Sequence, residues 1–131
     1  MAAYRLYVEL DGTTRIEPLD LLARPWENGP GDFKGVGGSV LGNASRVMLM
    51  RFERGARPPP HRAAPGFAVL LDGELVVSAS GGDEVTLRAG DAIRVETTGT
   101  GGWRLGNRAE GFALLALVQM PPPTSDRPTC P

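Results

Sequence analysis

The sequence predicts a single all-β domain, and three observations carry that prediction. A chain of 131 residues is long enough to bury one hydrophobic core but not two. Its 18 Gly and 12 Pro alternate with short apolar runs, as turns alternate with strands. Only residues 18–23 have the composition of a helical turn, and Pro25 would end it.

The chain opens with a pattern typical of a β-hairpin. Residues 4–10 alternate weakly between apolar and polar, Asp11-Gly12 follows, and residues 13–17 resume the strand-like composition. Asp-Gly is a frequent dipeptide in short hairpin turns because Gly accepts a positive φ. Residues 26–38 are rich in Gly, and we expect a loop or an irregular edge there.

Residues 47–53 form the next predicted strand. Alternation divides the side chains into two sets, with Met48, Met50 and Phe52 on one face and Val47, Leu49 and Arg51 on the other. The sequence does not decide which of the two faces points inward.

Residues 55–107 organise the rest of the chain. An apolar run at 67–71 leads to a tight turn at Asp72-Gly73 and resumes at 74–80, and a further segment at 84–95 follows the turn at 80–83. Strands separated by short Gly-containing turns predict an antiparallel meander. Pro58, Pro59 and Pro60 favour a stiff, extended arm that leads to His61.

Residues 111–120 are almost continuously apolar. Their length would also permit a buried helix, but the β context favours a strand that is buried on both faces. The Pro-rich residues 121–131 contain almost no apolar side chains, which predicts a poorly packed tail. We therefore expect a barrel with an N-terminal hairpin at 1–120 and a tail at 121–131.

Composition excludes several classes of function. The net charge is −1 and the Arg residues are scattered, so no basic stripe marks a nucleic-acid partner. Cys130 is the single cysteine, which rules out a disulfide within one chain. No apolar run approaches the ~18 residues of a spanning helix, and the first residues lack a signal-peptide pattern. A cytoplasmic protein without membrane contact is the simplest expectation.

The central stretch resembles the two sequence motifs of the cupin superfamily. In the first motif, Gly55 followed by five residues and His61 match its start, and Gly73 matches its closing Gly. In the second, Gly90-Asp91 match the start, and Asn107 matches the end if residues 97–102 hold one or two extra residues. The resemblance implies an antiparallel jelly-roll barrel, the double-stranded β-helix.

The same resemblance shows which family residues this chain lacks. Cupins usually hold a metal through His and Glu side chains, but three of those positions are Ala63, Gly66 and Trp103 here. The chain also has only 1 His, which excludes the two-His-one-carboxylate iron site and the common zinc sites within one chain. We expect no metal and no other cofactor.

The candidate site is an apolar cavity with one titratable group. The resemblance implies that His61 points into the barrel, where its imidazole can exchange protons near neutral pH. Trp103 replaces a metal ligand with a flat ring, and alternation places apolar neighbours beside it. The candidate catalytic residue is His61, and the candidate ligand-binding residues are Met48, Met50, Arg51, Ala63, Ala68, Leu70, Glu96, Trp103 and Leu105.

Each of these residues also has a purely structural interpretation. His61 would then be a hydrogen-bonded wall residue, Trp103 would pack the core, and Glu96 would be a solvated loop carboxylate. Met48 and Met50 fit a core as well as an adaptable pocket. Arg51 and Arg104 each suit a role in orienting an anionic or carbonyl group, but charged strand residues more often face solvent.

Fold alone does not fix function. The leading hypothesis is a metal-independent cupin that binds an apolar small molecule and catalyses isomerisation, cyclisation or dehydration with His61 as acid or base. The alternative is a binding or sensing module in which nothing reacts, and a metal-dependent dioxygenase is disfavoured. Apolar residues on both faces of two strands further predict a homodimer built by the outer sheet faces and the N-terminal hairpin.

Overall fold

The computed structural model describes residues 1–24, 26–28, 35, 37–58, 65–96 and 102–121. The strands are β1 (Ala3–Val8), β2 (Thr14–Pro18), β3 (Glu27–Asn28), β4 (Gly37–Gly38), β5 (Arg46–Phe52), β6 (Gly66–Asp72), β7 (Glu74–Ala79), β8 (Glu84–Arg88), β9 (Ala92–Val95), β10 (Trp103–Gly106) and β11 (Ala113–Gln119). A 3₁₀ turn, η1 (Leu21–Ala23), lies where the sequence predicted a helical turn.

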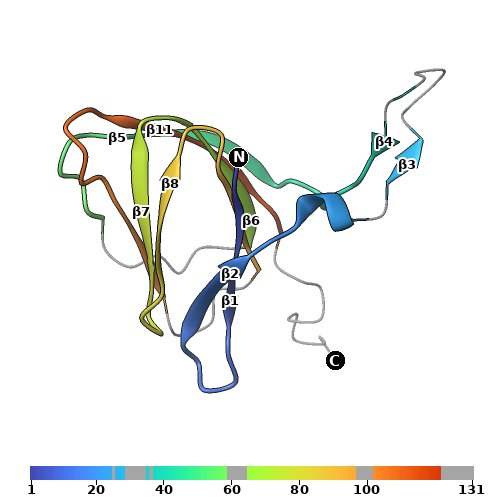
Figure 1. Cartoon of the computed structure of the whole chain (residues 1–131), viewed down its shortest axis with the longest axis horizontal. Helices are drawn as coiled ribbons and strands as arrows, with labels where there is room; N and C mark the ends of the chain where they lie inside the picture. Colours follow the sequence, from blue (N-terminus) through green and yellow to red (C-terminus); the bar gives the residue numbers. More distant parts are fainter. Residues whose placement is uncertain (25, 29–34, 36, 59–64, 97–101, 122–131) are drawn as a thin grey trace, which may run out of the picture.

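Two sheets form the walls of a barrel (Figure 1). The larger sheet has six strands in the order β2-β1-β9-β6-β11-β5, and the smaller has three in the order β10-β7-β8. Strands distant in sequence are therefore neighbours, as in a jelly roll. The predicted all-β barrel is confirmed.

The N-terminal hairpin is present and forms one end of the larger sheet. β1 and β2 pair antiparallel, with Leu6 opposite Ile16. The other edge of β1 pairs parallel with β9, placing Ala3 opposite Ala92. Since Leu6 is fully buried, the hairpin belongs to the core of the barrel.

The predicted meander needs two corrections. The turn at Gly73 does not join paired strands, because β6 belongs to the larger sheet and β7 to the smaller. The segment at 84–95 is likewise two strands, β8 and β9, which lie in different sheets. Only β7 and β8 form the predicted hairpin, with Val77 opposite Val85.

Local chemistry explains why glycine occupies position 73, at the corner between the two sheets. Its φ is +81°, a conformation that side chains rarely adopt. A Cβ at this position would also lie 2.7 Å from the carbonyl oxygen of Phe112. Both the positive φ and the close approach of Phe112 therefore require Gly at this position. The turn residues alone do not distinguish a corner between two sheets from a hairpin within one sheet.

The structure settles which face of β5 points inward. Phe52 is buried and Met50 packs against the core, whereas Val47 and Leu49 are 70% and 69% exposed. β11 is the central strand between β5 and β6, with Leu117 opposite Met48 and Ala68. Its inner side chains at Ala113 and Leu115 are buried, but the outer ones are only half-buried, so full burial on both faces was wrong.

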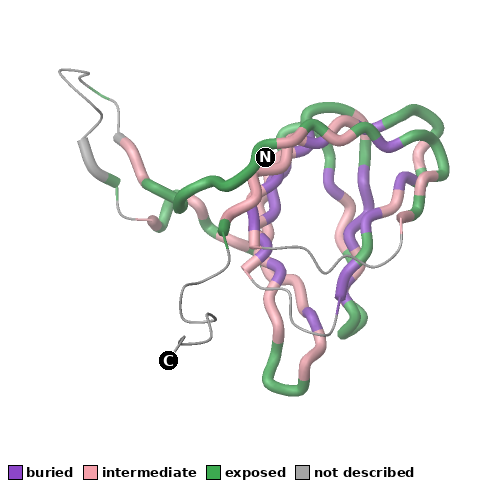
Figure 2. Tube along the Cα trace, turned by 180° about the vertical axis from the view of Figure 1, so that it is seen from behind, coloured by how far each residue is buried: buried purple, intermediate pink, exposed green. Residues whose placement is uncertain are grey.

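The core lies between the facing sheets (Figure 2). Large side chains from strands of both sheets are almost completely buried. Among them are Leu6, Leu70, Leu75, Leu87 and Ile93. Burying a side chain of this size contributes about 1.5–3 kcal/mol, so these contacts hold the two sheets together.

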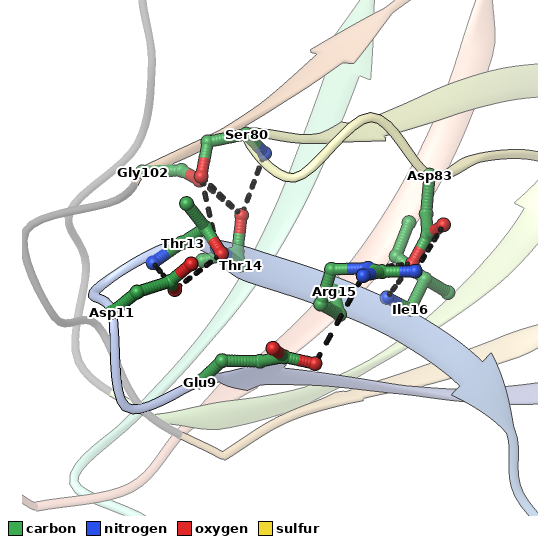
Figure 3. A network of polar contacts seen from close by, with 9 residues as sticks. All are labelled: Glu9, Asp11, Thr13, Thr14, Arg15, Ile16, Ser80, Asp83 and Gly102. Atoms are coloured by element: carbon green, nitrogen blue, oxygen red, sulfur yellow. Dashed lines mark hydrogen bonds and ion pairs between the residues drawn. The ribbon is translucent and has the colours of Figure 1, made fainter.

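A polar network joins the N-terminal hairpin to the turn at residues 80–83 (Figure 3). The Thr14 hydroxyl donates to the carbonyl of Gly102 at 2.6 Å and accepts from the backbone N–H of Ser80 at 2.7 Å. Asp83 accepts from Nε of Arg15 at 2.8 Å and from the N–H of Ile16 at 2.9 Å. These hydrogen bonds link the larger sheet to the smaller sheet at one end of the barrel.

The described residues between 26 and 38 include a short pair of strands where the sequence predicted a loop or an irregular edge. β3 and β4 pair antiparallel, with Glu27 opposite Gly38, and Figure 1 shows this pair standing away from the barrel. Among the described residues, no helix is long and apolar enough to cross a membrane. The predicted tail at 121–131 lies outside the described residues except for Pro121.

Candidate ligand-binding cavity

A cavity of about 200 Å³ opens between the two sheets. Side chains from β5, β6, β9, β10 and β11 line it, together with Leu87 of β8. The lining residues are mostly apolar and comprise Arg46, Met48, Met50, Gly66, Ala68, Leu87, Ile93, Val95, Trp103, Leu105, Leu115, Leu117 and Gln119. The cavity is therefore an extension of the apolar core that reaches the surface.

Five of the sequence-predicted ligand-binding residues meet at this cavity. They are Met48, Met50, Ala68, Trp103 and Leu105. Alternation explains the grouping, because residues two apart on a strand share a face. The indole of Trp103 is 8% exposed, so a flat apolar surface lies within the wall.

Three other candidates lie away from the cavity lining. Leu70 is fully buried in the core beyond it. Arg51 points out from β5, with its guanidinium carbon 4.3 Å from the centre of the Phe112 ring. Glu96 contacts Nε of Arg5 at 2.7 Å and also pairs with Arg94, so its carboxylate holds the outer side of the sheet.

The structure does not locate the catalytic candidate. His61 and Ala63 lie outside the described residues. The proposed role of His61 as acid or base therefore rests on the sequence and on the family resemblance alone.

Sequence reasoning missed the polar mouth of the cavity. Arg46 and Gln119 line it and stand opposite each other in the β5–β11 register. Extending the alternation from Met48 by one step gives Arg46, and the same step from Leu117 gives Gln119. The signal was present in the sequence, but it became useful only once the inward face of β5 was known.

The electrostatics of the cavity differ between its depth and its mouth. The deep residues offer no charge, whereas Arg46 is exposed and makes no ion pair with any described residue. A guanidinium beside an apolar hollow attracts an anionic or carbonyl group while the hollow takes the apolar part of the same molecule.

Comparison with known proteins supports the fold. No family model and no curated protein matches the chain. Among solved structures, a cupin protein from Bacteroides fragilis aligns with a TM-score of 0.51 and 18% identity over 66% of this chain and 74% of that one. A cupin-superfamily sugar phosphate isomerase from Silicibacter pomeroyi aligns with a TM-score of 0.50 and 26% identity. This chain has a cupin fold.

The second alignment is partial. It covers 59% of this chain and 50% of the isomerase, so the chain spans half the length of that relative. The isomerase activity is that of the Silicibacter protein. What carries over directly is the arrangement of the two sheets.

The cupin motif residues that this chain retains have structural roles. Asn107 is buried, and its amide nitrogen donates to the carbonyls of Phe52, Glu53 and Gly111 at 3.0, 3.2 and 2.9 Å. Asp91 accepts from the backbone N–H groups of Ala2 and Arg88, both at 2.8 Å. Burial tends to raise the pKa of Asp91, but these hydrogen bonds, together with the positive charges of the N-terminus and of Arg88, hold the pKa below its ordinary value.

The donor set around the cavity does not fit the usual cupin metal. None of the described lining residues carries an imidazole, thiolate or carboxylate, which are the usual side-chain ligands of zinc and iron. Among the described residues, no group of three or more His, Cys, Asp and Glu converges. The expected absence of a metal stays a prediction, because His61 is not among these residues.

Proposed function

We propose that this cupin binds a small molecule with an apolar body and a polar or anionic end. The observation that carries the proposal is the cavity with Trp103 in its wall and Arg46 at its mouth. Apolar burial would supply most of the affinity, and the guanidinium would orient the ligand. The hypothesis drawn from the sequence named an apolar small molecule, and the structure-based proposal adds a polar or anionic end to that ligand.

The size of the cavity limits the ligand. About 200 Å³ is below the ~300–1,000 Å³ typical of sites for drug-sized molecules. A single ring with a short chain, or an acyl chain of medium length, is a suitable occupant. Met48 and Met50 have unbranched, flexible side chains, which would adapt the wall to such shapes.

The sugar phosphate of the Silicibacter relative does not suit this cavity. A sugar needs a hydrogen-bond partner for each hydroxyl that leaves water, because an unpaired buried polar group is costly. Beyond Arg46 and Gln119, the described lining side chains are apolar apart from the indole N–H of Trp103. We therefore propose a different ligand class for this chain.

A direct test uses the intrinsic fluorescence of Trp103. The second tryptophan, Trp26, is 52% exposed, so a Trp26→Phe background isolates the signal. The probes are octanoate and 1-octanol, which differ chiefly in the anionic group. We expect both to quench the fluorescence of Trp103 saturably, and octanoate to bind more tightly. In that background Arg46→Gln should remove the preference for octanoate.

Matched variants on β6 separate occupancy from folding. Ala68 lines the cavity, whereas Val69 points to the outer face. Ala68→Phe should fill the cavity and abolish binding of both probes, and Val69→Phe should bind as the parent does. Unchanged binding by a folded Ala68→Phe variant would refute the proposal.

We also propose His61 as the acid or base if the bound molecule reacts, by isomerisation, cyclisation or dehydration. The family resemblance supports this role, which would not require a metal. Native mass spectrometry of freshly purified protein would identify a co-purified ligand and any metal. With that ligand in hand, turnover by the parent but not by His61→Gln would support catalysis, and binding without turnover would support the sensing module.

The outer face of the larger sheet supports a homodimer. Val47, Leu49, Leu71 and Phe112 are each about half exposed or more, and large exposed apolar patches mark interfaces. We propose that a second copy covers this face.

A further inference from the structure

A second hollow lies on the outer side of the smaller sheet. Its volume is about 450 Å³, and it is bounded by residues 54–57, by β7 and β10, and by residues 106–110. Four arginines line it, namely Arg54, Arg57, Arg104 and Arg108, and the acidic residue Glu110 lines it too. We call this hollow the arginine groove.

Backbone hydrogen bonds fix the two walls of the arginine groove relative to each other. Gly55 N–H donates to the carbonyl of Asn107 at 3.0 Å, and Asn107 N–H donates to the carbonyl of Ala56 at 2.9 Å. The buried amide of Asn107 further ties the segment to Phe52 and Glu53. The arginines therefore extend from a backbone frame that is already in place.

β10 separates the arginine groove from the apolar cavity. Trp103 and Leu105 point into the barrel and are buried, whereas Arg104 between them is exposed on the outer face. Arg104 stands opposite Ser78 in the register with β7. The two hollows thus lie on opposite sides of one strand and share Leu105 in their linings. The arginines of the second hollow do not line the first, so the second proposal does not depend on the proposed function.

The charges of the arginine groove are only partly compensated. Arg108 pairs with Glu84 at 2.8 Å, and this bond lowers the pKa of Glu84 below its ordinary value. Arg54, Arg57 and Arg104 make no ion pair within the described part of the chain. A local excess of positive charge therefore exists in a chain whose net charge is −1.

We propose that the arginine groove binds a small polyanion with closely spaced anionic oxygens, either a phosphate ester or a polycarboxylate. The planar guanidinium presents paired N–H donors that match phosphate and carboxylate oxygens. Several such groups around one hollow favour a compact ligand with two or more charges. Glu84 and Glu110 interrupt the positive surface around the groove, whereas an extended nucleic-acid backbone needs a continuous basic track.

Isothermal titration calorimetry of the full chain tests this site with pyrophosphate and with citrate. The two probes distinguish a phosphate source from a polycarboxylate source. The test variant is Arg57→Gln/Arg104→Gln, and the control is Arg88→Gln. Arg88 lies on the outer face of β8 beside Glu74, so its replacement removes a charge from the same sheet without altering the groove.

We expect saturable binding of at least one probe at low ionic strength, weakened about tenfold or more in the double variant. Arg88→Gln should stay within about twofold of the parent, and thermal stability should be unchanged in both because the side chains are exposed. The proposal is overturned if neither probe saturates at millimolar concentration. It is also overturned if Arg88→Gln weakens binding as much as the double variant, since that result would show only a general effect of net charge.

Discussion

The two sheets of the barrel share an apolar interior but differ in their outer faces. The part of the larger sheet formed by β5, β11 and β6 carries a continuous apolar set on its outer face: Val47, Leu49, Phe67, Val69, Leu71, Leu114, Ala116 and Val118. The rest of that sheet carries charged side chains there, including Arg5, Glu17 and Arg94. The outer face of the smaller sheet is mainly polar: Glu74, Ser78, Glu84, Thr86, Arg88 and Arg104, with Val76 as the apolar exception. Strict alternation of apolar and polar residues therefore marks strands whose outer face meets water. Its loss on β5, β6 and β11 marks the part of the larger sheet that we propose a partner covers.

The largest loss of stability on β10 is expected from replacing the inward-facing Trp103. Trp103→Ala removes a large buried ring and should cost about 3–5 kcal/mol of stability. Arg104→Ala on the next residue should change stability by less than about 0.5 kcal/mol, because the side chain is exposed. Urea unfolding of both variants gives the comparison. Equal losses would mean that the two faces of β10 are wrongly assigned.

A smaller loss of stability is expected at Asn107, which links the barrel to the segment that lines the arginine groove. Asn107→Ala would leave three carbonyls without the amide donor that now serves them. Leaving buried acceptors unpaired should cost about 1–3 kcal/mol. The urea midpoint measures that loss, and Asn107→Asp, which keeps the size but not the donor, should lose a similar amount. A stable Asn107→Ala variant would show that water replaces the amide.

Much of the fold could be predicted from local patterns. The β1–β2 hairpin, the β5 strand and the retained motif residues Gly90 and Asp91 pointed to the barrel correctly. Sheet membership could not be predicted in the same way. Gly73 and Gly90 allow the chain to turn, but which sheet the next strand joins depends on pairing with residues distant in sequence.

The candidate site was predicted only in part for the same reason. Trp103 and Leu105 followed from one strand and its alternation. Arg46 did not, because the sequence left both faces of β5 equally suited to the interior. Only the pairing of β5 with β11 brings Arg46 and Gln119 to the mouth of the cavity.

The outer face of the larger sheet offers a test of the proposed dimer with little effect on the fold. Leu49 is 69% exposed on the edge strand β5, so Leu49→Lys should convert a dimer to a monomer while the stability of the monomer changes by less than about 0.5 kcal/mol. Thr86→Lys on the smaller sheet is the matched control and should leave the mass unchanged. Light scattering at micromolar concentration measures both, and a monomeric parent would refute the dimer.

The smallest effect is expected at the joint between the two sheets, where Asp83 receives hydrogen bonds from the N-terminal hairpin (Figure 3). The side-chain bond from Arg15, followed by the backbone bond from Ile16, lowers the pKa of Asp83 below its ordinary value of 3.8. A carboxyl whose pKa is lowered in the folded state stabilises the fold when the pH is above the pKa of the unfolded state. That contribution is lost as the pH falls through the pKa of the folded state.

Asp83→Asn should therefore be less stable than the parent at pH 7, and the difference should shrink as the pH falls below about 3.8. Urea unfolding at pH 7, 5 and 3 measures this convergence. Arg15→Gln removes the side-chain hydrogen bond to Asp83. In that background Asp83→Asn should lower the stability at pH 7 by less, because only the bond from the Ile16 N–H remains. If the difference between parent and Asp83→Asn stayed constant from pH 7 to 3, the carboxylate charge would not contribute to the joint. The hairpin would then be held by the Thr14 bonds and by the burial of Leu6.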